Sequence, residues 1–378
     1  MELIYLDNAA TTPILPSVRQ AMEPYMQDVF GNPSSVHQAG RRAKAAIEKA
    51  REQVAKAIGA KATEIVFTSG GTESDNAALI SMALSLQEKG KHLVTTSIEH
   101  HAVLHTCAFL EQFGFEITYV EPNEQGIVTL AAIEQALRDD TILVSVMMVN
   151  NETGAIQPIA EIGALTTERG IAFHTDAVQA VGLLPVDVEA LQVDLLSMSG
   201  HKLHAPKGVG ALYVHSKTKW TPYLHGGNQE RQRRAGTENV ASIVGFGAAI
   251  ELAAQDRESK LAHIRDLRDT MLGIYRSELD NVVLNSPEDA LPSILNVTFT
   301  GVSAESLLMN LDMMGIAASS GSACTSGSLQ PSHVLMAMGL PVEHVKSAIR
   351  FSFSGHNTRD EVTEAASKIV QVVKRLRK

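Results

Sequence analysis

Short β-rich runs alternate with helical patterns between about residue 60 and residue 215. These runs are rich in β-branched and other apolar residues, and they lie at 64–68, 92–96, 116–120, 141–146, 171–174, 194–197 and 210–214. Strands separated by helices are typical of right-handed crossovers and of a mainly parallel sheet that is covered on both faces. The pattern therefore predicts an α/β domain with functional side chains at the carboxyl ends of its strands.

The pattern changes after residue 250. Apolar residues at helical spacing predict a long amphipathic helix over about 250–280, and β-rich runs follow at 293–299 and 348–353. Thr358 and Glu361 have the spacing of a capping box, which predicts a last helix running to Lys378. We expect a smaller α+β domain of residues 1–14 and 253–378 beside a large cofactor-binding domain of residues 15–252.

Composition narrows the class of protein. The 378 residues are 44% apolar and 20% charged, as in a globular protein, and the formal charge of −10 disfavours direct binding to nucleic acid or to an anionic membrane. The first residues show no basic leader with an apolar core, and no apolar run approaches the roughly 18 residues of a membrane span. We expect a cytoplasmic protein.

The two cysteines exclude a disulfide framework. Cys107 lies in an apolar helical stretch and is expected to be a buried structural thiol. Cys324 lies in a run of small and polar residues at 319–328 that cannot build a core. This composition predicts a mobile, exposed loop over about 319–333 with a reactive thiol.

Lys202 follows a buried strand within Ser199-Gly-His-Lys202. A lysine ordinarily has a pKa of about 10.4, so a nucleophilic lysine needs a desolvated pocket or a covalent carbonyl partner. Gly71 and Thr72 stand where another strand turns into a helix, a good seat for a phosphate. Asp176 ends a third strand, and a buried carboxylate there needs a cation such as the ring nitrogen of pyridoxal phosphate. Gln179 could then bind the phenolic oxygen of that ring.

Further candidates have structural alternatives. His100 suits stacking on a planar cofactor better than a zinc site, because no HExxH or paired-cysteine spacing accompanies it. Arg350 could clamp a substrate carboxylate or face outward from its strand. Asn32 and Asn151 lie in turns that could complete this pocket. Thr237 could supply a phosphate donor from a neighbouring subunit, although a solvated loop around 226–239 is the alternative.

The chain resembles the cysteine desulfurases of the NifS/IscS type. The resemblance rests on several motifs in one order over residues 5 to about 355, which are Tyr5-Leu-Asp-Asn-Ala-Ala-Thr-Thr12, Gly31-Asn-Pro-Ser-Ser35, Thr68-Ser-Gly-Gly-Thr-Glu-Ser74, Glu99-His-His101, Val149-Asn-Asn-Glu152, Asp176-Ala-Val-Gln179, Ser199-Gly-His-Lys202 and Ser322-Ala-Cys324. It implies a type I aminotransferase-like α/β fold, with a large domain built on a mainly parallel seven-stranded sheet and a smaller α+β domain. It also implies an obligate homodimer with active sites at the subunit interface.

The resemblance further implies a role for each candidate. Lys202 would bind pyridoxal 5'-phosphate covalently, with its phosphate seated by Gly71, Thr72, Ser199 and His201 and by Thr237 of the partner subunit. Asp176 would pair with the ring nitrogen, Gln179 with the phenolic oxygen, and His100 would stack on the ring and handle a proton. Asn32, Asn151 and Arg350 would orient L-cysteine.

The implied reaction converts L-cysteine to L-alanine and leaves a persulfide on Cys324. An iron–sulfur scaffold or a tRNA-thiolation enzyme would accept that sulfur, and Cys324 could serve as a transient iron–sulfur ligand although no resident metal is expected. A selenocysteine lyase or an aminotransferase of the same fold stays open. So does a sulfur-relay or iron–sulfur binding protein without catalysis.

Overall fold

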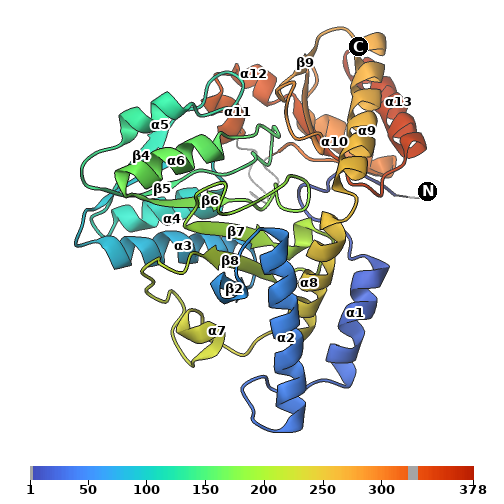
Figure 1. The fold of residues 1–378 in the computed structure, drawn as a ribbon. Helices are drawn as coiled ribbons and strands as arrows, with labels where there is room; N and C mark the ends of the chain where they lie inside the picture. The colour runs from blue at the N-terminus through green and yellow to red at the C-terminus, as the bar shows by residue number, and fades with distance from the viewer. Residues whose placement is uncertain (1–2, 322–330) are drawn as a thin grey trace.

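The computed structural model describes residues 3–321 and 331–378, so Cys324 lies outside the described part of the chain. At its centre is a seven-stranded sheet in the order β2-β8-β7-β6-β5-β3-β4 (Figure 1). Its strands are β2 (Ile65–Thr68), β3 (His92–Thr96), β4 (Glu116–Val120), β5 (Thr141–Ser145), β6 (Ala172–Asp176), β7 (Leu195–Ser199) and β8 (Gly210–Val214). All neighbours are parallel except β8, which is antiparallel to β2 and β7. The mainly parallel sheet expected from the sequence is confirmed.

Helices cover both faces of this sheet. On one face lie α3 (Gly71–Leu86) and α4 (His101–Glu111). The hydrophobic core on the other face includes residues of α1 (Pro16–Gln27), α2 (Gln38–Ala57), α5 (Leu130–Ala136), α6 (Ile159–Arg169) and α8 (Val240–Ala254). Successive strand residues divide between these cores, because side chains alternate across a strand: Val66 packs with α3, whereas Phe67 belongs to the opposite core.

A second group of strands and helices lies beside the large sheet, close to the C-terminus (Figure 1). It has a hydrophobic core of its own. It contains the antiparallel sheet β12-β10-β9 and the parallel pair β1-β11. The elements here are β1 (Ile4–Tyr5), α9 (Arg257–Glu278), β9 (Val282–Leu284), β10 (Ile294–Phe299), α10 (Ala304–Met313), β11 (Ile316–Ala317), β12 (Ala348–Ser352) and α13 (Arg359–Leu376). The capping box at the start of α13 is formed, with Glu361 N–H donating to Thr358 Oγ1 at 3.2 Å and Thr358 N–H to Glu361 Oε2 at 2.7 Å.

The amphipathic helix expected over about 250–280 is α9, which is separate from α8. The two helices are joined at Gln255 and Asp256, and Asp256 adopts a φ of 50°, which interrupts helical geometry. Because α8 belongs to a core of the large sheet and α9 to the C-terminal core, this joint connects the two. The domain boundaries at 14/15 and 252/253 stay a prediction.

Short elements complete the described chain. They are η1 (Ala62–Glu64), η2 (Gly200–Lys202), α7 (Gln229–Gln232), α11 (His333–Ala337) and α12 (Val342–Val345). Among residues 3–321 and 331–378, no helix is long and apolar enough to cross a membrane.

Candidate active site

Lys202 lies at the carboxyl end of β7, in the one-turn helix η2, as the sequence predicts. Its Nζ donates hydrogen bonds to the backbone oxygens of Ala9 at 2.5 Å and Ala10 at 2.7 Å. Gln179 Nε2 donates to the same Ala9 oxygen at 3.1 Å. The lysine and the glutamine of the expected cofactor site are therefore brought together by a segment close to the N-terminus.

This N-terminal segment also fixes the turn that carries the lysine. Thr12 donates from both its N–H and its hydroxyl to the His201 oxygen, each at 2.9 Å. His204 N–H donates to Thr12 Oγ1 at 2.8 Å, and His201 Nδ1 lies 3.1 Å from Thr11 Oγ1. Sequence reasoning assigned no role to residues 9–12. The signal was their small and polar side chains, which leave the backbone oxygens of this segment accessible.

The turn that the sequence predicts as a phosphate seat lies between β2 and α3. Gly70 adopts a φ of 152°, and α3 begins at Gly71, where a Cβ atom would approach Val178 Cγ2 to 2.9 Å. Ser199 is buried, and its Oγ has no hydrogen-bond partner among the described residues. Thr72 is exposed in the first turn of α3. An orphaned hydroxyl beside the N–H groups of a helix start fits an anion, so these residues fit the phosphate of pyridoxal phosphate.

Asp176 ends β6 as a buried carboxyl group. Burial raises its pKa to about 6, although a hydrogen bond of 2.8 Å from Val178 N–H and the positive charge of Lys202 oppose the shift. A carboxyl group in this setting gains from a facing cation, which the protonated ring nitrogen of the cofactor would provide. The residues present therefore fit the ring as well as the phosphate.

A buried polar network lies behind Asp176. His174 Nε2 lies 3.0 Å from Ser197 Oγ and 3.7 Å from Asp75 Oδ1 on α3. Burial lowers the pKa of His174 to about 3, so this imidazole is neutral. Burial, followed by the negative charge of Asp176, raises the pKa of Asp75 well above its usual range. Because His174 and Asp75 are both neutral, the negative charge at the end of β6 lies on Asp176.

His100 is the N-cap of α4, and its Nδ1 accepts a hydrogen bond of 3.1 Å from Ala102 N–H. The proton of the neutral ring is therefore on Nε2. Burial, with a further contribution from the positive charge of Lys202, lowers the pKa of His100 to about 4. A neutral, planar imidazole near Lys202 suits stacking on a cofactor ring.

Three further histidines gather beside His100. The His101 ring lies 5.1 Å from that of His105 and 4.7 Å from that of His333. Within the described residues, no group of three or more His, Cys, Asp or Glu side chains could hold a metal ion.

Arg350 is 2% exposed on β12, so the interpretation that it faces outward is wrong. Its NH1 donates to the Asn151 backbone oxygen at 2.8 Å, and its NH2 forms an ion pair of 2.9 Å with Asp7 Oδ1. Its Nε has no partner among the residues described. Arg350 and Asn151 therefore adjoin as expected, but Asp7 is a counter-ion that sequence reasoning missed.

Asn32 and Thr237 line neither of the cavities that Lys202 and His100 line. Asn32 is exposed in the turn before α2, where its Oδ1 accepts a hydrogen bond of 2.9 Å from Ser34 N–H. Thr237 lines a separate cavity of about 110 Å³ with Ser69 and Glu230. A contribution from a partner subunit stays a prediction for Thr237, and Cys324 lies outside the described residues.

The sequence matches the model of the class V aminotransferase family over residues 4–364. The chain belongs to this family. A cysteine desulfurase IscS of Dictyoglomus turgidum is 49% identical to it over 375 residues, which is 99% of this chain and 95% of that protein. A putative cysteine desulfurase IscS 1 of Bacillus subtilis is 51% identical over the full length of both chains. The family resemblance seen in the sequence motifs is confirmed.

Solved structures agree with this assignment. A NifS-like protein that is 36% identical superposes with a TM-score of 0.93 and covers 99% of this chain and 100% of its own. SspA, solved in complex with cysteine, is 38% identical, with a TM-score of 0.84 over 94% of this chain and 99% of its own. The type I aminotransferase-like fold is thereby confirmed, and the family depends on pyridoxal phosphate, as the sequence predicts.

Proposed function

We propose that this chain is a cysteine desulfurase that converts L-cysteine to L-alanine and transfers the sulfur to Cys324. The observation that carries the proposal is the assembly of Lys202, Gln179, Asp176 and His100 at the carboxyl ends of strands β7, β6 and β3. The Ser199 hydroxyl, which has no partner among the described residues, lies at the end of β7 beside them. Relatives about half identical over the whole chain are named cysteine desulfurases, which favours this reaction over others of the same fold.

Each residue has a task in this reaction. Pyridoxal phosphate, when bound, supplies an electron sink next to the substrate Cα. Asp176 holds the ring nitrogen protonated, and the Lys202 amine takes the Cα proton. Arg350 orients the substrate carboxylate, with its NH2 group held in place by Asp7.

The sulfur step needs a thiolate. The thiolate attacks the substrate sulfur, an S–S bond forms, the Cβ–S bond breaks, and Cβ takes up a proton to give alanine. Cys107 is 1% exposed on α4, and burial raises the pKa of its thiol, so it cannot serve. We therefore assign the step to Cys324.

Absorption and product analysis test the proposal together. We expect Lys202→Ala to lose the visible-edge band of the lysine-bound cofactor, and Cys324→Ala to keep that band but lose sulfide release in the presence of a thiol reductant. Cys107→Ala is the matched control and should keep both. Undiminished sulfide from Cys324→Ala would exclude the persulfide mechanism, and a folded but colourless wild-type protein would favour a sulfur relay without catalysis.

We also propose that the active form is a homodimer. A cavity of about 790 Å³ is lined by α3 and α4, and it leaves Phe113 60% and Phe109 43% exposed. Thr72 and His100 line the same cavity, so a second copy seated there would cover the cofactor site. Light scattering should give twice the chain mass for wild type and the single mass for Phe113→Asp; a wild-type monomer with full activity would contradict the dimer.

The physiological acceptor is proposed only as a class. An iron–sulfur scaffold or a tRNA-thiolation enzyme would take the sulfur from Cys324, and we place the reaction in the cytoplasm. Labelled sulfur loaded onto the enzyme should move to a protein of one of these two classes in a lysate of the source cells. Transfer to neither class would contradict this part of the proposal.

A further inference from the structure

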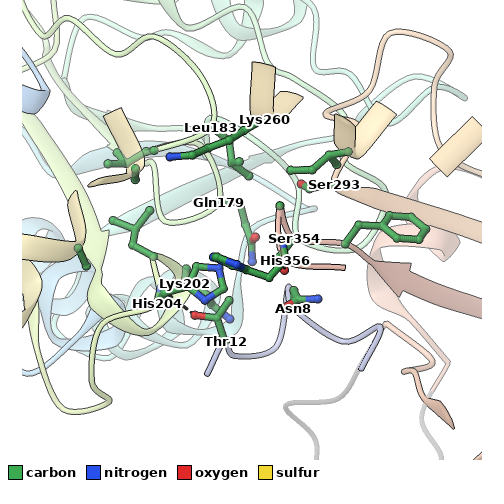
Figure 2. A pocket seen from close by; sticks show the side chains of 18 of the residues that line it. Asn8, Thr12, Gln179, Leu183, Lys202, His204, Lys260, Ser293, Ser354 and His356 are labelled. Atoms are coloured by element: carbon green, nitrogen blue, oxygen red, sulfur yellow. Dashed lines mark hydrogen bonds between the residues drawn. The ribbon is translucent and has the colours of Figure 1, made fainter. Parts of the chain in front are cut away.

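A further cavity, of about 140 Å³, is lined in part by the turn that carries Lys202 (Figure 2). Its walls come from the N-terminal segment, residues 178–183 after β6, this turn, the last turns of α8, the first turns of α9, Ser293 and the chain just after β12. It therefore lies at the joint between the large-sheet core and the C-terminal core. Lys202 and Gln179 line it, but Thr72, Ser199, Asp176, His100 and Arg350 do not. The cavity is thus separate from the seat of the phosphate and from the substrate arginine.

The lining combines an apolar body with basic groups. Leu252, Ile264 and Phe353 contribute apolar surface, and the described residues that line the cavity include no Asp or Glu. Lys260 faces the same space (Figure 2), and its Nζ donates a hydrogen bond of 2.6 Å to the Leu252 oxygen. Because an ammonium has three donors, at least one is left for a ligand.

Two histidines add polar rings to this lining. The rings of His204 and His356 meet edge to face with centroids 4.9 Å apart, and both residues line the cavity. Burial lowers the pKa of both histidines and of Lys260, and the positive charge of Lys260 contributes for each histidine. Asp256 acts on Lys260 from the helix joint, but it is exposed and does not line the cavity. Among the described residues, no carboxylate that lines the cavity faces Lys260 or the two histidines.

We propose that this cavity binds a small carboxylate with one apolar ring or short branched chain, whose carboxylate pairs with the Lys260 ammonium. Apolar cavities of about 150 Å³ accept a benzene-sized group, which sets the size of the ligand body. Lys260 also holds the last turn of α8 at the joint, and Lys202 lies in another wall. A ligand in this cavity therefore contacts both the joint between α8 and α9 and the turn that carries Lys202. The proposal does not depend on which protein accepts the sulfur.

The test uses the cofactor-loaded enzyme with benzoate as the probe and benzamide as its uncharged counterpart. Isothermal titration should detect benzoate binding that persists in saturating L-alanine, the proposed product at the active site. Lys260→Gln should weaken benzoate at least about tenfold, as the loss of one charge-assisted hydrogen bond predicts, whereas Lys260→Arg should retain most of the affinity. Arg265→Gln, which removes an exposed cation from the same helix, is the matched control and should bind like wild type.

Four results would overturn the proposal. They are the absence of benzoate binding at millimolar concentration, equal affinity for benzamide, displacement by L-alanine, and unchanged affinity in Lys260→Gln. The cofactor band and the melting temperature of each variant report whether it is folded. Because the readout is binding, failure of this proposal leaves the desulfurase reaction untouched.

Discussion

Glu99 is a fully buried carboxyl group, and we expect its ionisation to lower the stability of the fold at alkaline pH. Its Oε1 accepts hydrogen bonds of 2.8 Å from Thr96 Oγ1 and 2.8 Å from Met147 N–H. Its Oε2 has no partner in the described part of the chain. Burial raises the pKa of Glu99 from 4.5 to about 8, against the effect of these two hydrogen bonds.

The magnitude follows from proton linkage. Between pH 4.5 and about 8, the folded state keeps a proton that the unfolded state has released. The free energy of unfolding therefore falls with rising pH by about 1.4 kcal/mol per unit, or up to about 5 kcal/mol over this window. The contribution is complete below pH 4.5, is lost as pH rises through the folded-state value, and does not change further above it.

Glu99→Gln isolates this contribution, because an amide keeps the acceptor oxygen and does not ionise. Urea denaturation at several pH values from 5 to 9 should show a flatter pH dependence for the variant, with its greatest relative gain at pH 9. Glu111→Gln, an exposed carboxyl group at the end of α4, is the matched control and should follow wild type. Parallel pH curves for wild type and Glu99→Gln would refute the reasoning.

Three further predictions concern named contacts. Glu230→Ala leaves Arg51 buried without its bidentate partner and should lower the free energy of unfolding by about 3–5 kcal/mol in urea denaturation. Arg231→Ala breaks an exposed ion pair and should lower it by less than about 1 kcal/mol. Equal losses in the two variants would contradict this prediction. Arg350→Lys removes the planar guanidinium group and should raise KM for L-cysteine at least about tenfold, with a smaller change in kcat. An unchanged KM would exclude Arg350 as the group that binds the substrate carboxylate. Ser199→Ala should weaken cofactor binding about tenfold in reconstitution titrations, and full retention would exclude a phosphate contact.

The sequence located the elements of the large sheet well. All seven predicted runs are strands, and Asp176, Ser199 and Lys202 lie at their carboxyl ends. These predictions succeed because they rest on local periodicity and on the geometry of parallel sheets. Cys107 is also buried as expected.

The stretch at 226–239 contains a buried contact that the sequence does not predict. The solvated loop considered for this stretch is wrong at Glu230, which is 7% exposed and binds Arg51 through two hydrogen bonds of 2.7 and 2.8 Å. The backbone φ angle is 45° at Glu230 and 55° at Arg231, values that residues other than glycine rarely adopt. A charged run is predicted to be solvated because its neighbouring residues give no sign of a buried partner 179 residues away in the chain.

Sequence alone determined the order of strands and helices, the family, and the residue types that can carry pyridoxal phosphate chemistry. It could establish these because periodicity, strand ends and motifs are properties of neighbouring residues. The tertiary structure alone decided the partners: Ala9 and Ala10 on Lys202, and Asp7 on Arg350, 343 residues away in the chain. Burial requires each polar group to find a partner, but only the folded chain selects which one.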